Sequence, residues 1–297
     1  MKIGLIDVDG HNWPSLPLMK ISTLHKKHGD SVEWWNGLAH YDIVYISKVF
    51  TFSPDMEFCI NAEKVVRGGT GYTGNEPGYE KNLAPTVEHI YPDYSIYGIY
   101  DTAYGFLTRG CPRRCPFCIV SEKEGCQSHQ VAELPEFWGG QKYIKLLDPN
   151  LLAAAEAENL LNQLAQSKSY IDFSQGLDIR FMDKTRTDII KRIKIKMLHF
   201  AWDNPKQDLT DQFTAVKRWL GFHASKMTVY VLTNFYSSHD EDLRRIYTLR
   251  DLGYDPYVMI YDKENSPQET RRLQRWVNNK FIFKSCARFE DYDPKKG

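Results

Sequence analysis

Apolar and polar positions in the first 70 residues predict short strands separated by helical stretches. Residues 2–8 form an apolar run typical of a strand, and residues 16–28 carry apolar side chains at helical spacing. Three more strands and one more helix start are expected, at 31–35, 42–47, 64–66 and Ser53. Strands that alternate with helices indicate a parallel sheet with crossover connections. We therefore expect a Rossmann-like α/β domain over residues 1–70, followed by a connector over residues 71–100, which are rich in Gly, Pro and Tyr.

From residue 101 onward the pattern repeats a strand followed by a helix. Six strands are expected, at 104–108, 143–147, 170–174, 197–201, 228–232 and 257–261. Helices are expected at 151–166, with Asn150 as the cap, and at 183–193, 209–220 and 240–252. Six such units predict a partial (βα)6 barrel over residues 101–297. In TIM-barrel-like folds, the functional groups come from the carboxyl ends of the strands.

Charge and hydropathy narrow the functional classes. The chain has 297 residues, with 38 Lys and Arg against 38 Asp and Glu, so its formal net charge is zero. Two basic stretches, 184–196 and 271–275, are interrupted or flanked by acidic residues, which is typical of solvated helix faces. No apolar run approaches the roughly 18 residues that a membrane span needs. We expect a cytoplasmic protein that binds neither nucleic acid nor a membrane.

Three of the six cysteines are crowded into one short segment. Cys111, Cys115 and Cys118 have the spacing C-x3-C-x2-C. Three thiolates on one loop can hold three irons of a [4Fe–4S] cluster and leave the fourth iron open to a small molecule. The alternative is a structural zinc site with Cys126 as a fourth thiolate, because zinc prefers four closed ligands. A disulfide is less favoured, because the sequence opens on a strand pattern and not on a signal peptide.

The cysteine spacing, with the aromatic Phe117 directly before the last cysteine, resembles the motif of the radical S-adenosylmethionine (SAM) superfamily. The resemblance implies that SAM binds the open iron through its amino and carboxylate groups. It implies that an electron from the cluster cleaves SAM into methionine and a 5′-deoxyadenosyl radical, which starts radical chemistry on a substrate that the sequence does not identify. It also implies an external electron donor such as flavodoxin or ferredoxin.

Polar residues after the second and third barrel strands are candidates for binding SAM. The resemblance implies a Gly-Gly-Glu stretch after the second strand, where this chain has Asp148-Pro149-Asn150. Asp148 can accept hydrogen bonds from the ammonium group of SAM, and Asn150 either touches SAM or caps its helix. After the third strand, Arg180 can pair with the carboxylate of SAM, and Gln175 or Asp178 can bind ribose hydroxyls. The alternative for Asp178 and Arg180 is an ion pair that ties their loop.

Three later strand ends are candidates for substrate contacts. They comprise residues 202–204, 233–234 and 261–262, which include an Asp-Asn pair, an Asn and an Asp. Because parallel strands end at the same edge of a barrel, these residues are expected to face one opening. The alternative is ordinary turn chemistry, which favours the same residue types. No catalytic acid or base is assigned.

The loop after the first strand, Asp9-Gly10-His11, partly resembles the D-x-H-x-x-G signature of cobalamin-binding domains, whose histidine can ligate cobalt. Gly68-Gly69 is similar to a loop that those domains place beside the nucleotide tail. Pro14 stands where the signature has glycine, and proline lacks the backbone freedom of glycine. With Trp13 crowding the same strand end, we expect no stoichiometric cobalamin and a domain that helps to position the substrate.

Three alternatives to the main interpretation are kept. A cobalamin-dependent radical SAM methyltransferase would need a corrinoid in the first domain. A methylthiotransferase-like enzyme that inserts sulfur would need a second cluster, for which Cys59, Cys126 and Cys286 remain. A zinc-stabilised binding module without catalysis is the alternative from another class.

Overall fold

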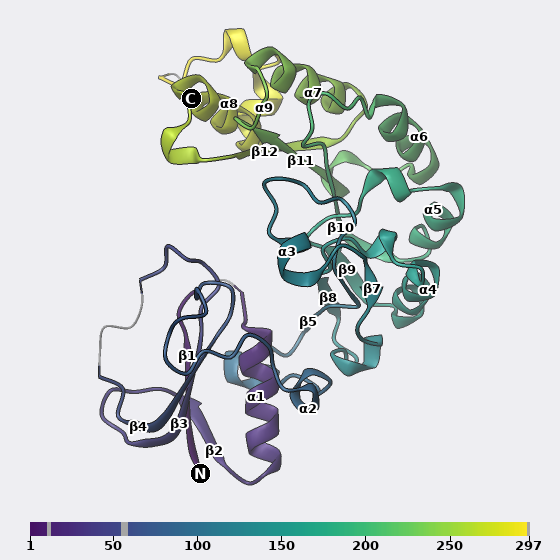
Figure 1. Ribbon diagram of the computed structural model, residues 1–297. Helices are drawn as coiled ribbons and strands as arrows, with labels where there is room; N and C mark the ends of the chain where they lie inside the picture. Colours follow the sequence, from purple (N-terminus) through teal and green to yellow (C-terminus); the bar gives the residue numbers. More distant parts are fainter. Residues whose placement is uncertain (11–12, 55–58, 296–297) are drawn as a thin grey trace. The chain divides into compact units, whose positions relative to one another are not determined.

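The computed structural model describes residues 1–10, 13–54 and 59–295. The chain divides into two compact units, one made of residues 1–105 with 134–142 and the other of residues 106–133 with 143–297. The expected connector, residues 71–100, belongs to the same compact unit as the N-terminal strands. Both units combine helices with a parallel main sheet, as the sequence predicts (Figure 1).

The first unit is built around a four-stranded parallel sheet with the order β2-β1-β3-β4. Its elements are β1 (Lys2–Asp7), α1 (Leu16–Lys27), β2 (Ser31–Trp34), β3 (Tyr41–Ser47), β4 (Ala62–Gly68), α2 (Pro85–Glu88) and β5 (Thr102–Gly105). Ile3 and Leu5 of β1 pack against Leu18 and Ile21 of α1, and burial of these side chains holds the helix on one face of the sheet. The helix start expected at Ser53 falls mainly on residues 55–58, outside the described residues, and the described residues beside them are not helical.

The second unit contains five parallel strands that lie side by side in chain order, β8-β9-β10-β11-β12. The strands are β6 (Thr108–Arg109), β7 (His129–Gln130), β8 (Tyr143–Leu146), β9 (Tyr170–Phe173), β10 (Lys194–Ala201), β11 (Met227–Thr233) and β12 (Asp255–Ile260). The helices are α3 (Val120–Glu124), α4 (Ala157–Ser167), α5 (Lys184–Ile190), α6 (Thr210–Leu220), α7 (His239–Asp251), α8 (Gln268–Asn278) and α9 (Lys280–Ser285). Together with β5, all six expected strands are present in the expected chain order.

Helices α4 to α8 lie along one face of the strands of the second unit (Figure 1). The side chains that point to this face are apolar and fully buried: Ile144, Ile171, Leu198, Val229 and Val258. Side chains alternate between the two faces of a strand, so the intervening residues line the opposite face. Those residues are mostly polar or aromatic, which gives the sheet one apolar and one polar side.

Two expected elements differ from the structure. The helix expected over residues 151–166 begins only at Ala157, after a short 3-10 turn at Leu151–Ala153, and the Asn150 side chain makes no capping hydrogen bond. The prediction that Asn150 caps a helix is therefore wrong, because the α-helix begins only at Ala157 and the 3-10 turn donates no hydrogen bond to the Asn150 side chain. The strand expected over residues 104–108 ends at Gly105, and the separate strand β6 pairs antiparallel with β7.

Helix α8 and helix α9 were not expected. The buried residues of α8, Thr270, Leu273, Trp276 and Val277, have helical spacing, a signal that the arginines of this stretch obscured. None of the helices that the structure describes has the length and apolar character needed to cross a membrane.

Candidate cofactor site

The cysteine loop, residues 110–128, is closed at its base by the short β6–β7 ladder. Gly110 has a φ of +81°, and a Cβ atom there would lie 2.0 Å from the main-chain oxygen of Gln127, so only glycine fits. The main-chain N–H of Cys111 donates to the oxygen of Gly125 at 3.1 Å. Glu124 accepts from the Arg109 guanidinium at 2.9 Å. These contacts join the start of the loop to its end.

The three thiols differ in exposure but lie close enough for their charges to interact. Cys111 and Cys115 are half-buried, whereas Cys118 is exposed. Cys115 and Cys118 are joined by a tight turn, in which the N–H of Cys118 donates to the oxygen of Cys115 at 3.0 Å. Burial raises the pKa of the Cys115 thiol. The positive charge of Arg113 opposes this effect, and negative charge on Cys118 or Cys111 adds to it.

The chemistry of these donors fits a cluster with one open iron. Within residues 1–10, 13–54 and 59–295, no three His, Cys, Asp or Glu side chains surround one point as the ligands of a metal ion would. The loop does, however, supply three closely spaced thiols, and its fourth cysteine, Cys126, lies eight residues after Cys118. The thiol of Cys126 is directed to the main-chain oxygen of Ser121, with a sulfur-to-oxygen distance of 3.9 Å. A closed zinc site would need this thiol in addition to the three of the C-x3-C-x2-C run.

Asp148 holds the segment that leads into the cysteine loop. Its carboxylate is 4% exposed and accepts hydrogen bonds from the N–H groups of Leu107 and Thr108, at 3.1 and 2.5 Å, and from the Thr108 hydroxyl at 2.7 Å. Burial raises its pKa to about 6, although these hydrogen bonds act in the opposite direction. The structure favours a positioning role for Asp148. The expected contact with the ammonium group of SAM stays a prediction.

Asn150 contacts the cysteine loop directly. Its side-chain nitrogen lies 3.5 Å from the Cys111 sulfur, and its main-chain oxygen accepts from the Ser128 hydroxyl at 2.9 Å. The other atom of the amide, Oδ1, is buried and has no hydrogen-bond partner among the residues that the structure describes. Buried polar atoms are rarely left without a partner. This oxygen is therefore available to accept a hydrogen bond from a molecule bound beside Cys111.

Asp178 and Arg180 form the ion pair that sequence analysis kept as an alternative. The Arg180 Nε donates to Asp178 Oδ1 at 2.6 Å, and its Nη1 donates to Gln207 Oε1 at 2.9 Å. Arg113 of the cysteine loop lies 3.9 Å from the second oxygen of Asp178. The loop after β9 is thereby linked to the cysteine loop, a contact that no sequence spacing indicates. Gln175 is exposed at the same strand end.

Phe117 packs against an aromatic cluster at the ends of the last two strands. Its ring lies 5.2 Å from that of Phe235, which lies 4.8 Å from that of Tyr261, both in edge-to-face geometry. Sequence analysis missed Phe235, although it directly follows the candidate strand end at residues 233–234. The side chain of Asn234 donates to the main-chain oxygen of Tyr261 at 2.8 Å, so it links the two loops.

Backbone strain concentrates on the cysteine loop and at these strand ends. Arg114, Asn234, Tyr236 and Asp262 adopt left-handed backbone conformations, with φ between +45° and +61°. Among the described residues that are not glycine, only Lys168 also has a positive φ. Such strain persists only where surrounding structure enforces it, and it is enriched at functional sites.

The strand end at residues 202–204 contains one core residue and one buried acid. Trp202 is fully buried and donates to the main-chain oxygen of Gln207 at 2.8 Å, so it belongs to the core and not to a substrate surface. Burial raises the pKa of Asp203 to about 6, against the opposing charges of Arg245, Arg180 and Arg113. The charge of Asp203 also raises the pKa of Cys115. Asp203 is thus electrostatically coupled to the cysteine loop.

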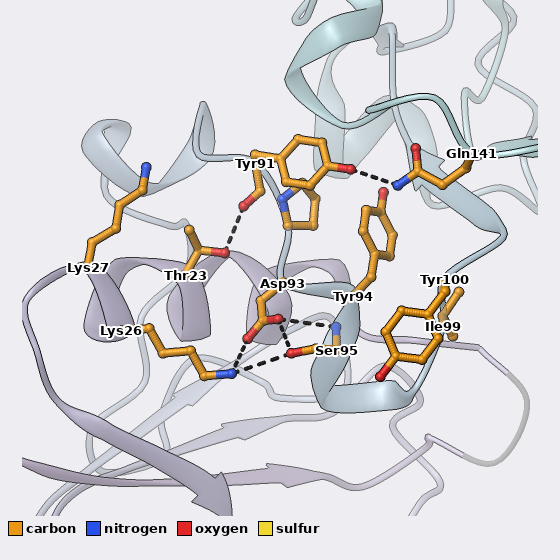
Figure 2. A pocket seen from close by; sticks show the side chains of 11 residues that line it. Thr23, Lys26, Lys27, Tyr91, Asp93, Tyr94, Ser95, Ile99, Tyr100 and Gln141 are labelled. Atoms are coloured by element: carbon orange, nitrogen blue, oxygen red, sulfur yellow. Dashed lines mark hydrogen bonds and ion pairs between the residues drawn. The ribbon is translucent and has the colours of Figure 1, made fainter.

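The first unit has an open cavity of about 560 Å³ that contains none of the expected site residues (Figure 2). Lys26 there pairs with Asp93 at 2.6 Å, and the hydroxyl of Tyr91 accepts from Gln141 at 2.7 Å. Tyr94 is mostly buried. These polar groups satisfy one another, which favours packing over ligand binding.

At the strand ends of the first unit, the loop expected to resemble a cobalamin site is only partly described, because His11 lies outside the described residues. Asp9 accepts from the N–H groups of Val49 and Phe50, at 2.6 and 3.3 Å, and from the hydroxyl of Ser53. A Cβ atom at Gly69 would lie 2.1 Å from the main-chain oxygen of Lys48. Close packing of two loops therefore accounts for the glycine without a ligand.

No family model matches the chain, and no curated protein matches its sequence. Among solved structures, the chain is similar to that of the radical SAM methyltransferase TsrM from Kitasatospora setae, determined with cobalamin and a [4Fe–4S] cluster bound. The TM-score is 0.59 over 87% of this chain and 72% of that one, at 12% sequence identity. Another match, the C-terminus of E. coli RcsC with its linker region and phosphoreceiver domain, has a TM-score of 0.21, which carries no weight. The expected fold class is confirmed: the chain has a mixed α/β fold with parallel sheets that it shares with a radical SAM protein.

Proposed function

We propose that the protein is a radical SAM enzyme in which Cys111, Cys115 and Cys118 hold a [4Fe–4S] cluster. The observation that carries the proposal is the C-x3-C-x2-C loop directly after the first barrel strand, in a chain whose fold resembles that of a radical SAM methyltransferase. When bound, such a cluster supplies the electron that cleaves SAM. The substrate remains unassigned, and an external donor such as flavodoxin or ferredoxin would deliver the electron.

The chain's own residues would position the loop and SAM. Asp148 fixes the entry to the cysteine loop, and the Asn150 amide offers its unpaired oxygen beside Cys111. Phe117, Gln175, Asp178 and Arg180 are the proposed SAM contacts, because they lie on the cysteine loop or at the end of β9. The guanidinium of Arg180 is about one-quarter exposed, so it can pair with a carboxylate while Asp178 holds it in place.

The cluster is tested by metal analysis of anaerobically purified protein. Replacing all three loop cysteines by alanine should abolish the iron content and the brown chromophore. Cys126→Ala is the matched control and should leave both near the wild-type level, because the thiol of Cys126 has its own partner at Ser121. Zinc in the wild-type protein, or complete loss of metal in the Cys126 variant, would support the zinc-stabilised module instead.

SAM cleavage is tested with dithionite as the reductant and no added substrate. The anaerobic wild-type protein should form 5′-deoxyadenosine slowly, and Arg180→Ala should weaken SAM binding more than it lowers the iron content. Unchanged SAM affinity in this variant would remove Arg180 from the SAM site. Absence of 5′-deoxyadenosine from iron-loaded protein would overturn the proposed function.

Methyl transfer through cobalamin is the second candidate. It is favoured by the similarity to TsrM, whose structure contains cobalamin. It is disfavoured by Pro14 and by Asp9, whose carboxylate is already engaged by the loop after β3. A methylthiotransferase-like reaction has less support, because Cys59, Cys126 and Cys286 lie far apart in the sequence.

A further inference from the structure

A row of polar and aromatic side chains crosses the face of the second sheet that helices α4 to α8 leave uncovered. Five neighbouring strands each contribute one residue: Lys145, Asp172, His199, Tyr230 and Tyr257. Lys145 is in register with Asp172, and Tyr230 is in register with Tyr257. We call these five residues the inner row.

Contacts connect the inner row from β9 to β12. The His199 Nδ1 lies 3.7 Å from Asp172 Oδ1. The His199 ring stacks on Tyr230 with centroids 5.2 Å apart and planes inclined by 5°, and Tyr230 meets Tyr257 edge-to-face at 5.9 Å. Tyr257 and Met259 are 38% and 46% exposed, so this end of the row is open to solvent. The inner row is a connected surface that opens to solvent at its β12 end.

The partners of His199 fix which ring nitrogen carries the hydrogen. Nδ1 lies 3.2 Å from the main-chain oxygen of Phe173 and 3.7 Å from Asp172 Oδ1. Both of these atoms are acceptors, so Nδ1 is the donor and Nε2 keeps its lone pair. Burial lowers the pKa of His199, Asp172 raises it and Lys145 lowers it, with a net lowering. The ring is therefore neutral at pH 7, with Nε2 able to accept a proton.

The groups around His199 favour its role as a proton acceptor. Asp172 is 9% exposed, and its Oδ1 has no hydrogen-bond partner within the described part of the chain. An unsatisfied buried carboxylate oxygen is costly, and a proton on His199 would let Nδ1–H and Asp172 attract each other more strongly. Burial raises the pKa of Tyr230 to about 12, so its hydroxyl keeps its proton and the ring acts as a neutral stacking partner.

Deepening the proposed function, we propose that the inner row binds the substrate and that His199 Nε2 accepts a proton from it. The substrate would carry an N–H or O–H group beside a flat part that packs against Tyr230 and Tyr257. In the transfer, the N–H or O–H bond breaks, its electron pair stays on the substrate atom, and the proton forms a new bond to Nε2. Asp172 is the positioning residue that stabilises the resulting imidazolium.

The accessibility and basicity of Nε2 are tested with diethyl pyrocarbonate as the probe, on anaerobically purified protein, with peptide mass spectrometry between pH 5 and 8. His199 should be modified, with a half-maximal rate below the ordinary histidine pKa of about 6.5. Exposed His28 is the positive control, and buried His25 is the negative control. No modification of His199 while His28 reacts would overturn the proposal.

Charge variants separate a positioned base from a merely structural histidine. Asp172→Asn should move the half-maximal pH of His199 further down, and Lys145→Met should move it up, because these charges act on the ring in opposite directions. Met259→Ala on the same face is the matched control and should move nothing. If Asp172→Asn does not fold, the Lys145 variant still decides, and an unmoved midpoint contradicts the electrostatic argument.

A last measurement separates the test of the proposed function from that of His199. Formation of 5′-deoxyadenosine by wild-type protein without substrate tests the proposed function alone, and the diethyl pyrocarbonate results test the basicity of His199 alone. Failure of wild-type protein to cleave SAM would refute the proposed function and leave the probe results on His199 unaffected.

Discussion

Single residues near the cysteine loop contact partners that lie far from them in the sequence. The cysteine spacing indicated a cluster loop, because ligands of one cluster lie on one short segment. The sequence could not show that Asp148 holds Leu107 and Thr108, since those partners lie about 40 residues earlier and leave no periodic signal. For the same reason Asn150 was expected as a cap, although its amide contacts the sulfur of Cys111.

Asp148 gives a pH-dependent prediction. Its pKa of about 6 in the folded protein lies above the ordinary value of 3.8, so its contribution to stability is full below about pH 3.8 and is lost as the pH rises through 6. Between pH 4.5 and 7, the free energy of unfolding of wild type relative to Asp148→Asn should fall by about 2 kcal/mol. Urea unfolding at several pH values measures this difference, and parallel pH profiles of the two proteins would contradict it.

At the scale of elements, strands were predictable within a few residues, because each carries an apolar face that must be buried. Helix starts were less predictable where capping or a short turn determines the first residue, as at Ala157. The β6–β7 ladder has two residues on each side, too few for any alternation to be read. The links between strand ends, such as Arg113 with Asp178, depend on how loops fold back and were not predictable.

One buried cation, Arg245, joins helix α7 to the ends of β10 and β11. Arg245 is fully buried and donates to the main-chain oxygens of Asp203 and Leu232, at 3.1 and 2.8 Å, and to Asp242. Arg245→Met should lower the free energy of unfolding by about 3 kcal/mol or more, because it leaves the charge of Asp242 buried and unpaired. Exposed Arg218→Met is the matched control, with an expected change within about 0.5 kcal/mol.

Urea unfolding of both arginine variants measures the effect. Adding Asp242→Leu to the Arg245 variant should recover part of the lost stability, since the buried charge of Asp242 is then removed as well. A loss at Arg245 no larger than that at Arg218 would mean that the buried network does not hold α7.

At the scale of the whole molecule, alternating strands and helices sufficed to predict an α/β chain with a Rossmann-like part and a partial barrel. The boundaries of the two compact units were harder to predict from the sequence. Residues 134–142 belong with the first unit although they lie between β7 and β8 of the second. Such an excursion leaves no mark in composition, because its residues are of the same types as the surrounding loops.

One prediction at the scale of the whole molecule is that the protein does not bind cobalamin. Protein incubated with hydroxocobalamin and passed through gel filtration should retain no stoichiometric corrinoid, because Asp9 is engaged by Val49 and Phe50 and Pro14 stiffens the loop. Absorbance of the eluted protein measures the retained corrinoid. Stoichiometric retention that is lost in His11→Ala would make methyl transfer the leading function.

The strand order of the second unit has a consequence for how the chain is made. Because each of the strands β9 to β12 pairs with the strand before it, each new strand closes only one helical connection onto a strand already synthesised. The sheet can therefore grow in the direction of translation, without waiting for a distant partner. Ribosome-bound chains in which residues up to Gly253 have left the exit tunnel should already protect β8 to β10 against brief proteolysis. Protection that arises only after release of the full chain would show that assembly waits for the last strand.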